Sequence, residues 1–266
     1  MSSKAQYALD NAWDKARERL SGLESMADPG TIRNFERLGV DTGWNCLEAG
    51  AGGGSMTAWL ADRVGPEGEV LAIDLDTRFV ESLPHPNLSV RKMDLLADDL
   101  PSKTFDLVHT RALLIHLPDP QSTIQKLTET LAPGGWLLVE EMDFVSAAAV
   151  PGVDASQADL FEKVVHAHNR VLAERGDPWY GRRAADDLRD CQLESVDAEG
   201  RTIIVRGDTP GATAWRLTFE QLADRILELE LATDAELDAV QHVLQDPDFA
   251  FQSMVFMAAW GRKPAA

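Results

Sequence analysis

A glycine-rich turn between a short apolar run and an amphipathic segment constrains this chain more than any other feature. The apolar run covers residues 44–47, Glu48 follows it, and glycines stand at positions 50, 52, 53 and 54. Glycine adopts a positive φ readily, and because it lacks Cβ a ligand can press against its backbone. The helical pattern that begins at Ser55 would point its first N–H groups at the turn. The stretch therefore predicts a buried strand, a ligand-contacting loop and a helix.

The spacing of these glycines separates two kinds of nucleotide site. The dinucleotide fingerprint G-x-G-x-x-G/A opens at Gly50, but Ser55 occupies its sixth position. The pattern acid-x-G-x-G-x-G is complete in Glu48, Gly50, Gly52 and Gly54. This pattern resembles motif I of the class I methyltransferases, which bind S-adenosylmethionine. The resemblance implies that Glu48 lies near the methionine amino group of the cofactor and that the glycines line its amino-acid and sulfonium side.

A second acid stands where such a site would bind a ribose. Residues 69–73 read as a strand that ends at Asp74, twenty positions after Gly54. Nucleotide sites of α/β proteins use an acid there to accept hydrogen bonds from the two ribose hydroxyls. We therefore expect Asp74 to bind the ribose and the adjoining Leu75 to belong to the cofactor site, whereas Asp76 suits a helix cap better.

A third acid follows the next predicted strand, residues 88–91, with an apolar side chain on each side of it. The resemblance implies that Asp94 accepts a hydrogen bond from the adenine amino group, while Met93 and Leu95 cover the two faces of the ring. A flat base requires apolar faces and one acceptor at its edge, and this triplet supplies both.

Two later landmarks agree with the resemblance. Residues 105–111 read as a fourth strand, and a Pro-Gly-Gly turn at residues 133–135 precedes a buried strand that reaches Glu141. The match is most specific over residues 44–143. It implies an α/β fold with a Rossmann-like seven-stranded, mostly parallel sheet, an antiparallel last strand and helices on both faces.

The remaining segments are expected to be mostly helical. Residues 1–40 read as an N-terminal helical cap of two helices, the second of which starts at Asp28 and Pro29 and stops at Gly39. Residues 41–266 would form the cofactor-binding methyltransferase domain, with a helical insertion at about 208–248 before the last strand, 251–260. Such an insertion commonly forms a substrate lid.

Charge and composition limit the partners. The chain has 25 basic and 44 acidic residues, a net charge of −19, which disfavours nucleic acid and anionic membranes as partners. No run of 18 apolar residues occurs, and residues 1–10 lack the pattern of a secretory signal. The cysteines, Cys46 and Cys191, form no C-x-x-C pair, so a cytoplasmic protein with free thiols is expected. We predict a monomer or homodimer without a metal site.

The expected chemistry depends more on positioning than on any one side chain. Displacement of a methyl group from a sulfonium needs the reactants in line, and positioning can contribute about 7–11 kcal/mol. A general base adds roughly 10²–10⁴-fold, and only for a hydroxyl or a protonated amine. The candidate bases are His116, His109 and Glu141, each of which also has a purely structural interpretation. His109 and Arg111 are expected at the cofactor as well.

The substrate is expected to be a small molecule. The fourth strand exits through His109, Thr110 and Arg111 rather than the Asn/Asp-Pro-Pro-Tyr of enzymes that methylate planar amides and nucleobase amines. Candidate substrate contacts come from the N-terminal segment, the end of the fifth strand and the helical region that follows. They are Tyr7, Trp13, Glu140, Asp143, His166, Arg170, Trp179 and Tyr180.

The sequence therefore predicts an S-adenosylmethionine-dependent methyltransferase, similar to stand-alone bacterial enzymes, that methylates O, N or C of a metabolite and releases S-adenosylhomocysteine. Two alternatives stay open. The cofactor could be bound but used for a rearrangement or for structure. A nicotinamide oxidoreductase is disfavoured by the incomplete fingerprint and by the lack of a Tyr-x-x-x-Lys pair, since Ala184 follows Tyr180 and Asn11 follows Tyr7 at that spacing.

Overall fold

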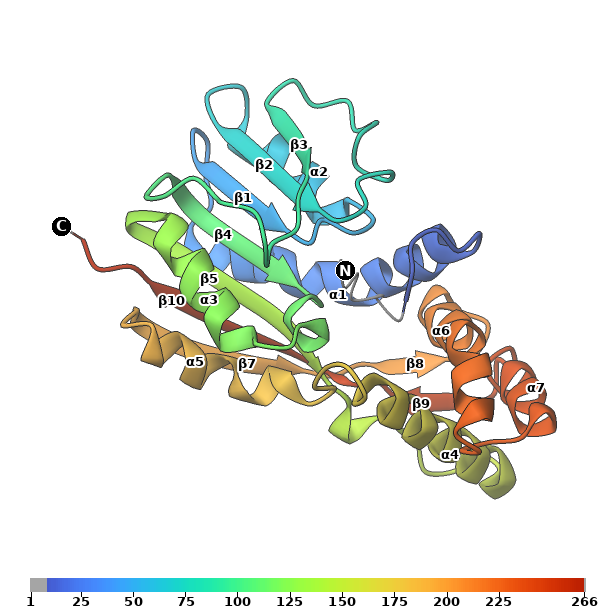
Figure 1. Cartoon of the computed structure of the whole chain (residues 1–266). Coiled ribbons are helices and arrows are strands. Elements are labelled where there is room, and N and C mark those ends of the chain that lie inside the picture. The colour runs from blue at the N-terminus through green and yellow to red at the C-terminus, as the bar shows by residue number, and fades with distance from the viewer. Residues whose placement is uncertain (1–8, 266) are drawn as a thin grey trace. The chain divides into compact units, whose positions relative to one another are not determined.

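The structure, a computed structural model, describes residues 9–265, and the chain divides into two compact units (Figure 1). The sheet unit comprises residues 27–143, 179–201 and 256–265. The helical unit comprises residues 9–26, 144–178 and 202–255. Each unit is thus assembled from segments that are far apart in the sequence. The domain boundary predicted after residue 40 stays a prediction.

The sheet unit contains seven strands in the order β3-β2-β1-β4-β5-β10-β7. Their bounds are β1 Asn45–Ala49, β2 Glu69–Asp74, β3 Leu88–Lys92, β4 Phe105–Arg111, β5 Leu131–Asp143, β7 Glu194–Arg201 and β10 Val255–Arg262. The pairs β1–β2, β1–β4, β2–β3 and β4–β5 are parallel, whereas β10 runs antiparallel to β7. The predicted Rossmann-like sheet with an antiparallel last strand is confirmed.

Helices cover both faces of this sheet. On one face, α2 (Ser55–Val64) and the second half of α1 (Ala16–Leu38) bury Phe35, Leu60 and Val64 against the strands. Burial of side chains of this size stabilises the fold by roughly 1.5–3 kcal/mol each. On the other face, α3 (Pro120–Thr130) packs on β4 and β5, and α5 (Ala184–Asp190) packs on β7 (Figure 1). Short 3-10 helices, Leu114–His116 and Tyr180–Arg183, follow β4 and precede α5.

Helix α1 does not break at Pro29, so the predicted second helix with an Asp28 cap is wrong. A proline inside a helix removes one N–H and crowds the carbonyl four residues earlier. The helix nevertheless continues, because its C-terminal half is held by the packing of Phe35 and Leu38 in the core. Asp28 instead lies 2.9 Å from Nη2 of Arg111. Residues 9–15 form turns rather than the expected helix, and the segment after Asp76 also forms turns.

The helical unit contains three further helices and a small antiparallel sheet. Its helices are α4 (Ala155–Leu172), α6 (Pro210–Glu228) and α7 (Asp234–Val243), and the 3-10 helix Phe144–Ser146 precedes them. Its strands are β6 (Ala148–Ala149), β9 (Ala250–Gln252) and β8 (Ile204–Arg206), in the order β6-β9-β8. Thr209 and Thr233 cap α6 and α7 through their hydroxyls. The single last strand predicted at 251–260 is therefore two strands, β9 and β10, in different sheets. Within residues 9–265 no helix is both long and apolar enough to cross a lipid bilayer.

Candidate functional site

The glycine loop follows β1 at the point where the strand order reverses, since β1 pairs with β2 on one side and β4 on the other. Ligands of open α/β sheets bind in the crevice at such a point. Gly50, Gly52 and Gly54 have φ values of 79°, 52° and 90°, in the region that favours glycine. A Cβ on Gly54 would lie 2.8 Å from Val80, and one on Gly50 would lie 3.1 Å from Leu113. A Cβ on Gly52 would meet nothing nearer than a carbonyl oxygen at 3.9 Å, so this position faces open space.

Asp74, at the end of β2, is bound to this loop. Its Oδ2 accepts a hydrogen bond from the Gly52 N–H at 2.9 Å, and its Oδ1 accepts one from the Asp76 N–H at 2.9 Å. Burial raises the pKa of Asp74, and these two backbone donors partly offset the rise. Each carboxylate oxygen keeps a second lone pair, which a hydroxyl could use. The next side chain, Leu75, is 56% exposed and so presents apolar surface beside Asp74.

The three residues predicted at the adenine follow β3. Asp94 is exposed, and its Oδ1 accepts a hydrogen bond from the Leu96 N–H at 2.9 Å. Met93 is half-buried, and its N–H donates to the Asp74 carbonyl at 2.9 Å, which ties this segment to the end of β2. Leu95 is buried. The predicted apolar pair thus has one partly accessible member, Met93, and one member inside the fold.

A buried histidine connects the tips of three neighbouring strands. Glu48 of β1 and His109 of β4 are register partners, and His109 Nδ1 lies 2.6 Å from Glu48 Oε2. His109 Nε2 lies 3.4 Å from Oε2 of Glu140 on β5. Burial alone would lower the pKa of His109, but attraction to Glu48 and hydrogen bonds with Glu140 and Glu48 raise it to about 9. Burial would likewise raise the pKa of Glu140, but the bond to His109 holds it below its ordinary value. The three groups therefore form a carboxylate–imidazolium–carboxylate chain.

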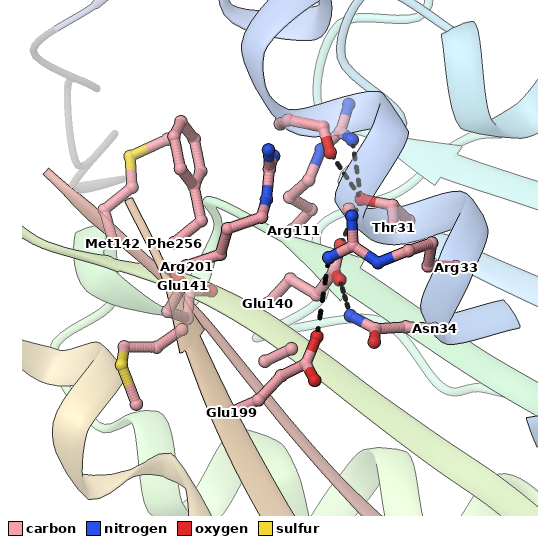
Figure 2. A pocket seen from close by; sticks show the side chains of 14 residues that line it. Thr31, Arg33, Asn34, Arg111, Glu140, Glu141, Met142, Glu199, Arg201 and Phe256 are labelled. Carbon is pink, nitrogen blue, oxygen red and sulfur yellow. Dashed lines mark hydrogen bonds and ion pairs between the residues drawn. The ribbon is translucent and has the colours of Figure 1, made fainter. Parts of the chain in front are cut away.

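The hydrogen bonds of these three groups continue to helix α1 through Thr31 and Asn34, which the sequence analysis did not select. Glu140 accepts hydrogen bonds from the Thr31 hydroxyl and, at 2.8 Å, from Nδ2 of Asn34 (Figure 2). Arg111 donates to Thr31 Oγ1 at 2.9 Å, and its Nη2 lies 3.4 Å from the hydroxyl of Ser55, the first residue of α2. One continuous polar network thus runs from β1 to the start of α2.

The same network borders a pocket, here called the α1 pocket, which Figure 2 shows with its 14 lining side chains. The lining comes from α1, β4, β5, β7 and β10. Glu140, Arg111 and Asn34 form its polar side, and Met142 and Phe256 contribute apolar surface. Two charged residues of β7, Glu199 and Arg201, also line it.

Other predicted residues have structural partners. Both oxygens of Glu141 accept hydrogen bonds from backbone N–H groups of Leu113, Leu114 and Ile115, at 3.0, 2.7 and 3.4 Å. Burial raises the pKa of Glu141 to about 8, although these donors act in the opposite direction. Glu141 thus holds the 3-10 helix that carries His116, which is half-buried.

The remaining substrate candidates that the structure describes are divided between the two units. Asp143 receives two bonds from Arg182, both at 2.6 Å, and Tyr180 is fully buried with its hydroxyl donating to Asp187 at 2.7 Å. Trp179 is 39% exposed. Trp13, His166 and Arg170 belong to the helical unit, and Tyr7 lies outside the described residues. Among the described residues, neither the network nor the lining of the α1 pocket includes Trp13, His166 or Arg170.

The residues that the sequence analysis missed left a weak signal. Thr31 and Asn34 are one turn apart on a helix whose neighbouring positions, Ile32 and Phe35, are apolar. Polar residues at the edge of a core-facing helical stripe can be buried, and a buried polar group needs a hydrogen-bond partner. Nothing in the sequence indicates that Arg201 would approach the same helix.

Residues 6–191, well over half of the chain, match the family described as "Methyltransferase domain". The chain belongs to this methyltransferase family. The resemblance to class I S-adenosylmethionine-dependent methyltransferases is thereby confirmed, and with it S-adenosylmethionine as the cofactor type.

Curated relatives match only part of this chain. Methyltransferase str2 of Strobilurus tenacellus is 37% identical over 159 residues, which are 57% of this chain and 56% of that protein. Methyltransferase str3 of the same fungus is 29% identical over 191 residues, 68% of this chain and 64% of that protein. The chain thus spans less than two thirds of the length of these curated relatives.

Solved structures share the fold at low identity. A putative methyltransferase from an antibiotic biosynthesis pathway of Anabaena variabilis has a TM-score of 0.59 at 15% identity, over 88% of this chain and 96% of that one. The [4+2]-cyclase SpnF has a TM-score of 0.56 at 19% identity, over 90% and 82%. Both similarities concern the fold alone.

Proposed function

We propose that this methyltransferase transfers a methyl group from S-adenosylmethionine to a small molecule held in the α1 pocket. One observation carries the proposal: Arg111 is shared by the pocket and the glycine loop. Its guanidinium lines the pocket, and its Nη2 lies 3.4 Å from the hydroxyl of Ser55, directly after the loop. A methyl donor on the loop and an acceptor in the pocket would therefore be neighbours within one unit. The net charge of −19 favours a small metabolite over a nucleic acid.

The residues around the loop suit the cofactor. Gly52 offers open space where a side chain would stand, and both oxygens of Asp74 could accept from the ribose hydroxyls. Leu75 and Met93 offer apolar surface to the adenine. When bound, the cofactor supplies a methyl group on a positively charged sulfur, which is already an activated leaving group. His109 occupies one oxygen of Glu48, and the second oxygen would face the cofactor ammonium.

We propose different roles for the candidate bases. A His109 imidazolium with a pKa of about 9, between two carboxylates, holds its protons at neutral pH and so positions the strand tips. Glu141 is bound by three backbone N–H groups and positions the segment that carries His116. His116 is the remaining base for an acceptor that loses a proton. The main contribution of the protein is alignment, for which about 7–11 kcal/mol is attainable.

Product analysis tests this proposal. The protein is incubated with S-adenosylmethionine and fractionated metabolites, and mass spectrometry follows S-adenosylhomocysteine together with any metabolite whose mass increases by one methyl group. Coupled formation of both products supports the proposal. Binding of the cofactor without release of S-adenosylhomocysteine from any fraction would favour the rearrangement or structural use. Binding of a nicotinamide nucleotide in its place would favour the oxidoreductase.

A further inference from the structure

The side-chain amide of Asn34 has one bound end and one unmatched end. Its Nδ2 donates a hydrogen bond of 2.8 Å to Oε1 of Glu140 (Figure 2), and the residue is only 2% exposed. Its Oδ1 is buried and has no hydrogen-bond partner among residues 9–265. Buried polar atoms of folded proteins are nearly always hydrogen-bonded, so an unmatched one calls for an explanation. Asn34 lines the α1 pocket, and a molecule bound there would supply the missing donor.

The orientation of this amide follows from its partner. Burial would raise the pKa of Glu140, but the hydrogen bond to His109 holds it below its ordinary value, so the carboxylate is ionised. An ionised carboxylate only accepts hydrogen bonds, and therefore the nitrogen of Asn34 faces Glu140. The nearby hydroxyl of Thr31 gives its one hydrogen to Glu140 as well. The unmatched end of Asn34 is thus an acceptor.

The size of the pocket limits the group that reaches this acceptor. The cavity has a volume of about 20 Å³, and roughly 10–15 Å³ is enough for one water molecule. A hydroxyl fits such a space. A carboxylate or a phosphate has more non-hydrogen atoms, and in its ionised form it carries no hydrogen that Asn34 could accept.

The charges around the pocket do not favour an ionic ligand. Glu199 pairs with Arg37 at 2.7 Å and with Arg33 at 3.7 Å (Figure 2 shows the second pair). Burial, and after it the charge of Arg33, lowers the pKa of Arg201, which also lines the pocket. These surroundings disfavour a further positive charge, such as the ammonium of a protonated amine. A neutral donor therefore suits the pocket best.

We propose that the methyl acceptor carries a neutral hydroxyl, which donates a hydrogen bond to Oδ1 of Asn34 while its apolar part packs on Phe256 and Met142. The inference rests on the proposed function, since it names the substrate class of the same pocket. It assigns Asn34 to substrate recognition rather than to the chemical step. A site that bonds a substrate hydroxyl rejects an analogue without it, because the buried atom of the site is then left unpaired.

Titrations with four small aromatic probes test this inference. The protein, saturated with S-adenosylhomocysteine, is titrated by ligand-observed NMR with phenol, toluene, benzoate and benzylammonium. Phenol and toluene are similar in size and differ in the donor, whereas the other two probes carry opposite charges. We expect phenol to bind about tenfold more tightly than toluene, which corresponds to about 1.4 kcal/mol, and more tightly than either ion.

Two variants assign the preference to the amide oxygen. Asn34→Leu removes Oδ1, so it should abolish the preference for phenol while it retains the binding of toluene. This substitution also removes a donor to Glu140. Thr31→Val is the matched control, because it removes another donor to Glu140 but leaves Oδ1 of Asn34 in place, and it should retain the preference.

The outcomes separate this inference from the proposed function. Equal binding of phenol and toluene by the wild-type protein would mean that only an ordered water matches Oδ1, and would overturn the inference. Tighter binding of either ion than of phenol, or an unchanged preference in Asn34→Leu, would overturn it as well. Binding of S-adenosylhomocysteine verifies that each variant is folded; if Asn34→Leu fails this test, the wild-type series decides. Failure of the wild-type protein to bind S-adenosylhomocysteine would instead contradict the proposed function.

Discussion

The Nδ1 atom of His109 lies 2.6 Å from Oε2 of Glu48, and both side chains are buried at the tips of adjacent parallel strands. With Glu140 on its other nitrogen, the imidazolium joins β1, β4 and β5, and Glu140 extends the connection to α1 through Thr31 and Asn34. The proposed acceptor pocket and the glycine loop are therefore held by one charged network.

Removal of the histidine should destabilise the protein strongly. His109→Gln leaves the carboxylates of Glu48 and Glu140 buried without their shared positive charge, and loss of one partner from a buried ion pair reduces stability by about 3–5 kcal/mol. Urea denaturation at pH 7 measures this loss. His242→Gln, an exposed position at the end of α7, is the matched control and should change stability by less than about 0.5 kcal/mol. A His109→Gln variant as stable as the control would contradict the charged network.

The same histidine should make stability depend on alkaline pH. Its pKa is about 9 in the folded protein against 6.5 for the free group, so its contribution is complete below pH 6.5 and disappears as pH rises through 9. The difference in unfolding free energy between wild type and His109→Gln should therefore decrease over this window, by on the order of 3 kcal/mol. Denaturation curves at pH 6, 7, 8 and 9 measure it. A difference that is constant or increases with pH would mean that His109 is neutral in the folded state.

Two loop glycines should respond differently to alanine. A Cβ on Gly54 would lie 2.8 Å from Val80, whereas one on Gly52 points into open space. Both positions have positive φ, which disfavours alanine by about 1–2 kcal/mol. Gly54→Ala should therefore lose more stability than Gly52→Ala, and Gly52→Ala should lose affinity for S-adenosylhomocysteine out of proportion to its stability. Calorimetric titration measures the affinity of both variants for S-adenosylhomocysteine, and denaturation measures their stability. Unchanged affinity in Gly52→Ala would show that the loop does not contact the cofactor.

Arg111 should matter for the cofactor as well as for the pocket. Its guanidinium lies 2.9 Å from both Asp28 and Thr31 and 3.4 Å from Ser55. Arg111→Met breaks these contacts, so we expect about 1–3 kcal/mol less stability and roughly tenfold weaker binding of S-adenosylhomocysteine. Arg189→Met, at an exposed arginine of α5 that pairs with Asp186, is the matched control. Equal binding by the two variants would show that the network does not support the loop.

The parts of the fold that the sequence predicted are those set by local backbone chemistry. Three features require particular residues at particular positions and can therefore be recognised in the sequence alone. They are the glycine loop at residues 50–54, the acid at the end of β2 and the Pro-Gly-Gly turn near the start of β5. The strand order then followed from the resemblance that these features carry. Asp74 stands at the end of β2 and accepts a hydrogen bond from Gly52 of the loop that follows β1.

The remaining features depend on tertiary contacts. Local sequence rules predicted a break at Pro29, but helix α1 is continuous there. Burial of Phe35 and Leu38 in the core outweighs the hydrogen bond that the proline removes. Glu48 and His109 are 61 residues apart, and their pairing arises only from the register of β1 on β4. Arg201 reaches Gly30 for a similar reason, because β7 enters the sheet beyond β10.

The central claim is that Asp74 binds the ribose of S-adenosylmethionine beside the glycine loop. Isothermal titration calorimetry with S-adenosylhomocysteine tests it on wild type, Asp74→Asn and the neighbouring Asp76→Asn. Hydrogen bonds to a charged group contribute about 1.5–3 kcal/mol, so we predict saturable binding by wild type, roughly 10- to 100-fold weaker binding by Asp74→Asn, and little change in Asp76→Asn. No binding by the wild-type protein, or equal affinities for all three, would contradict the claim.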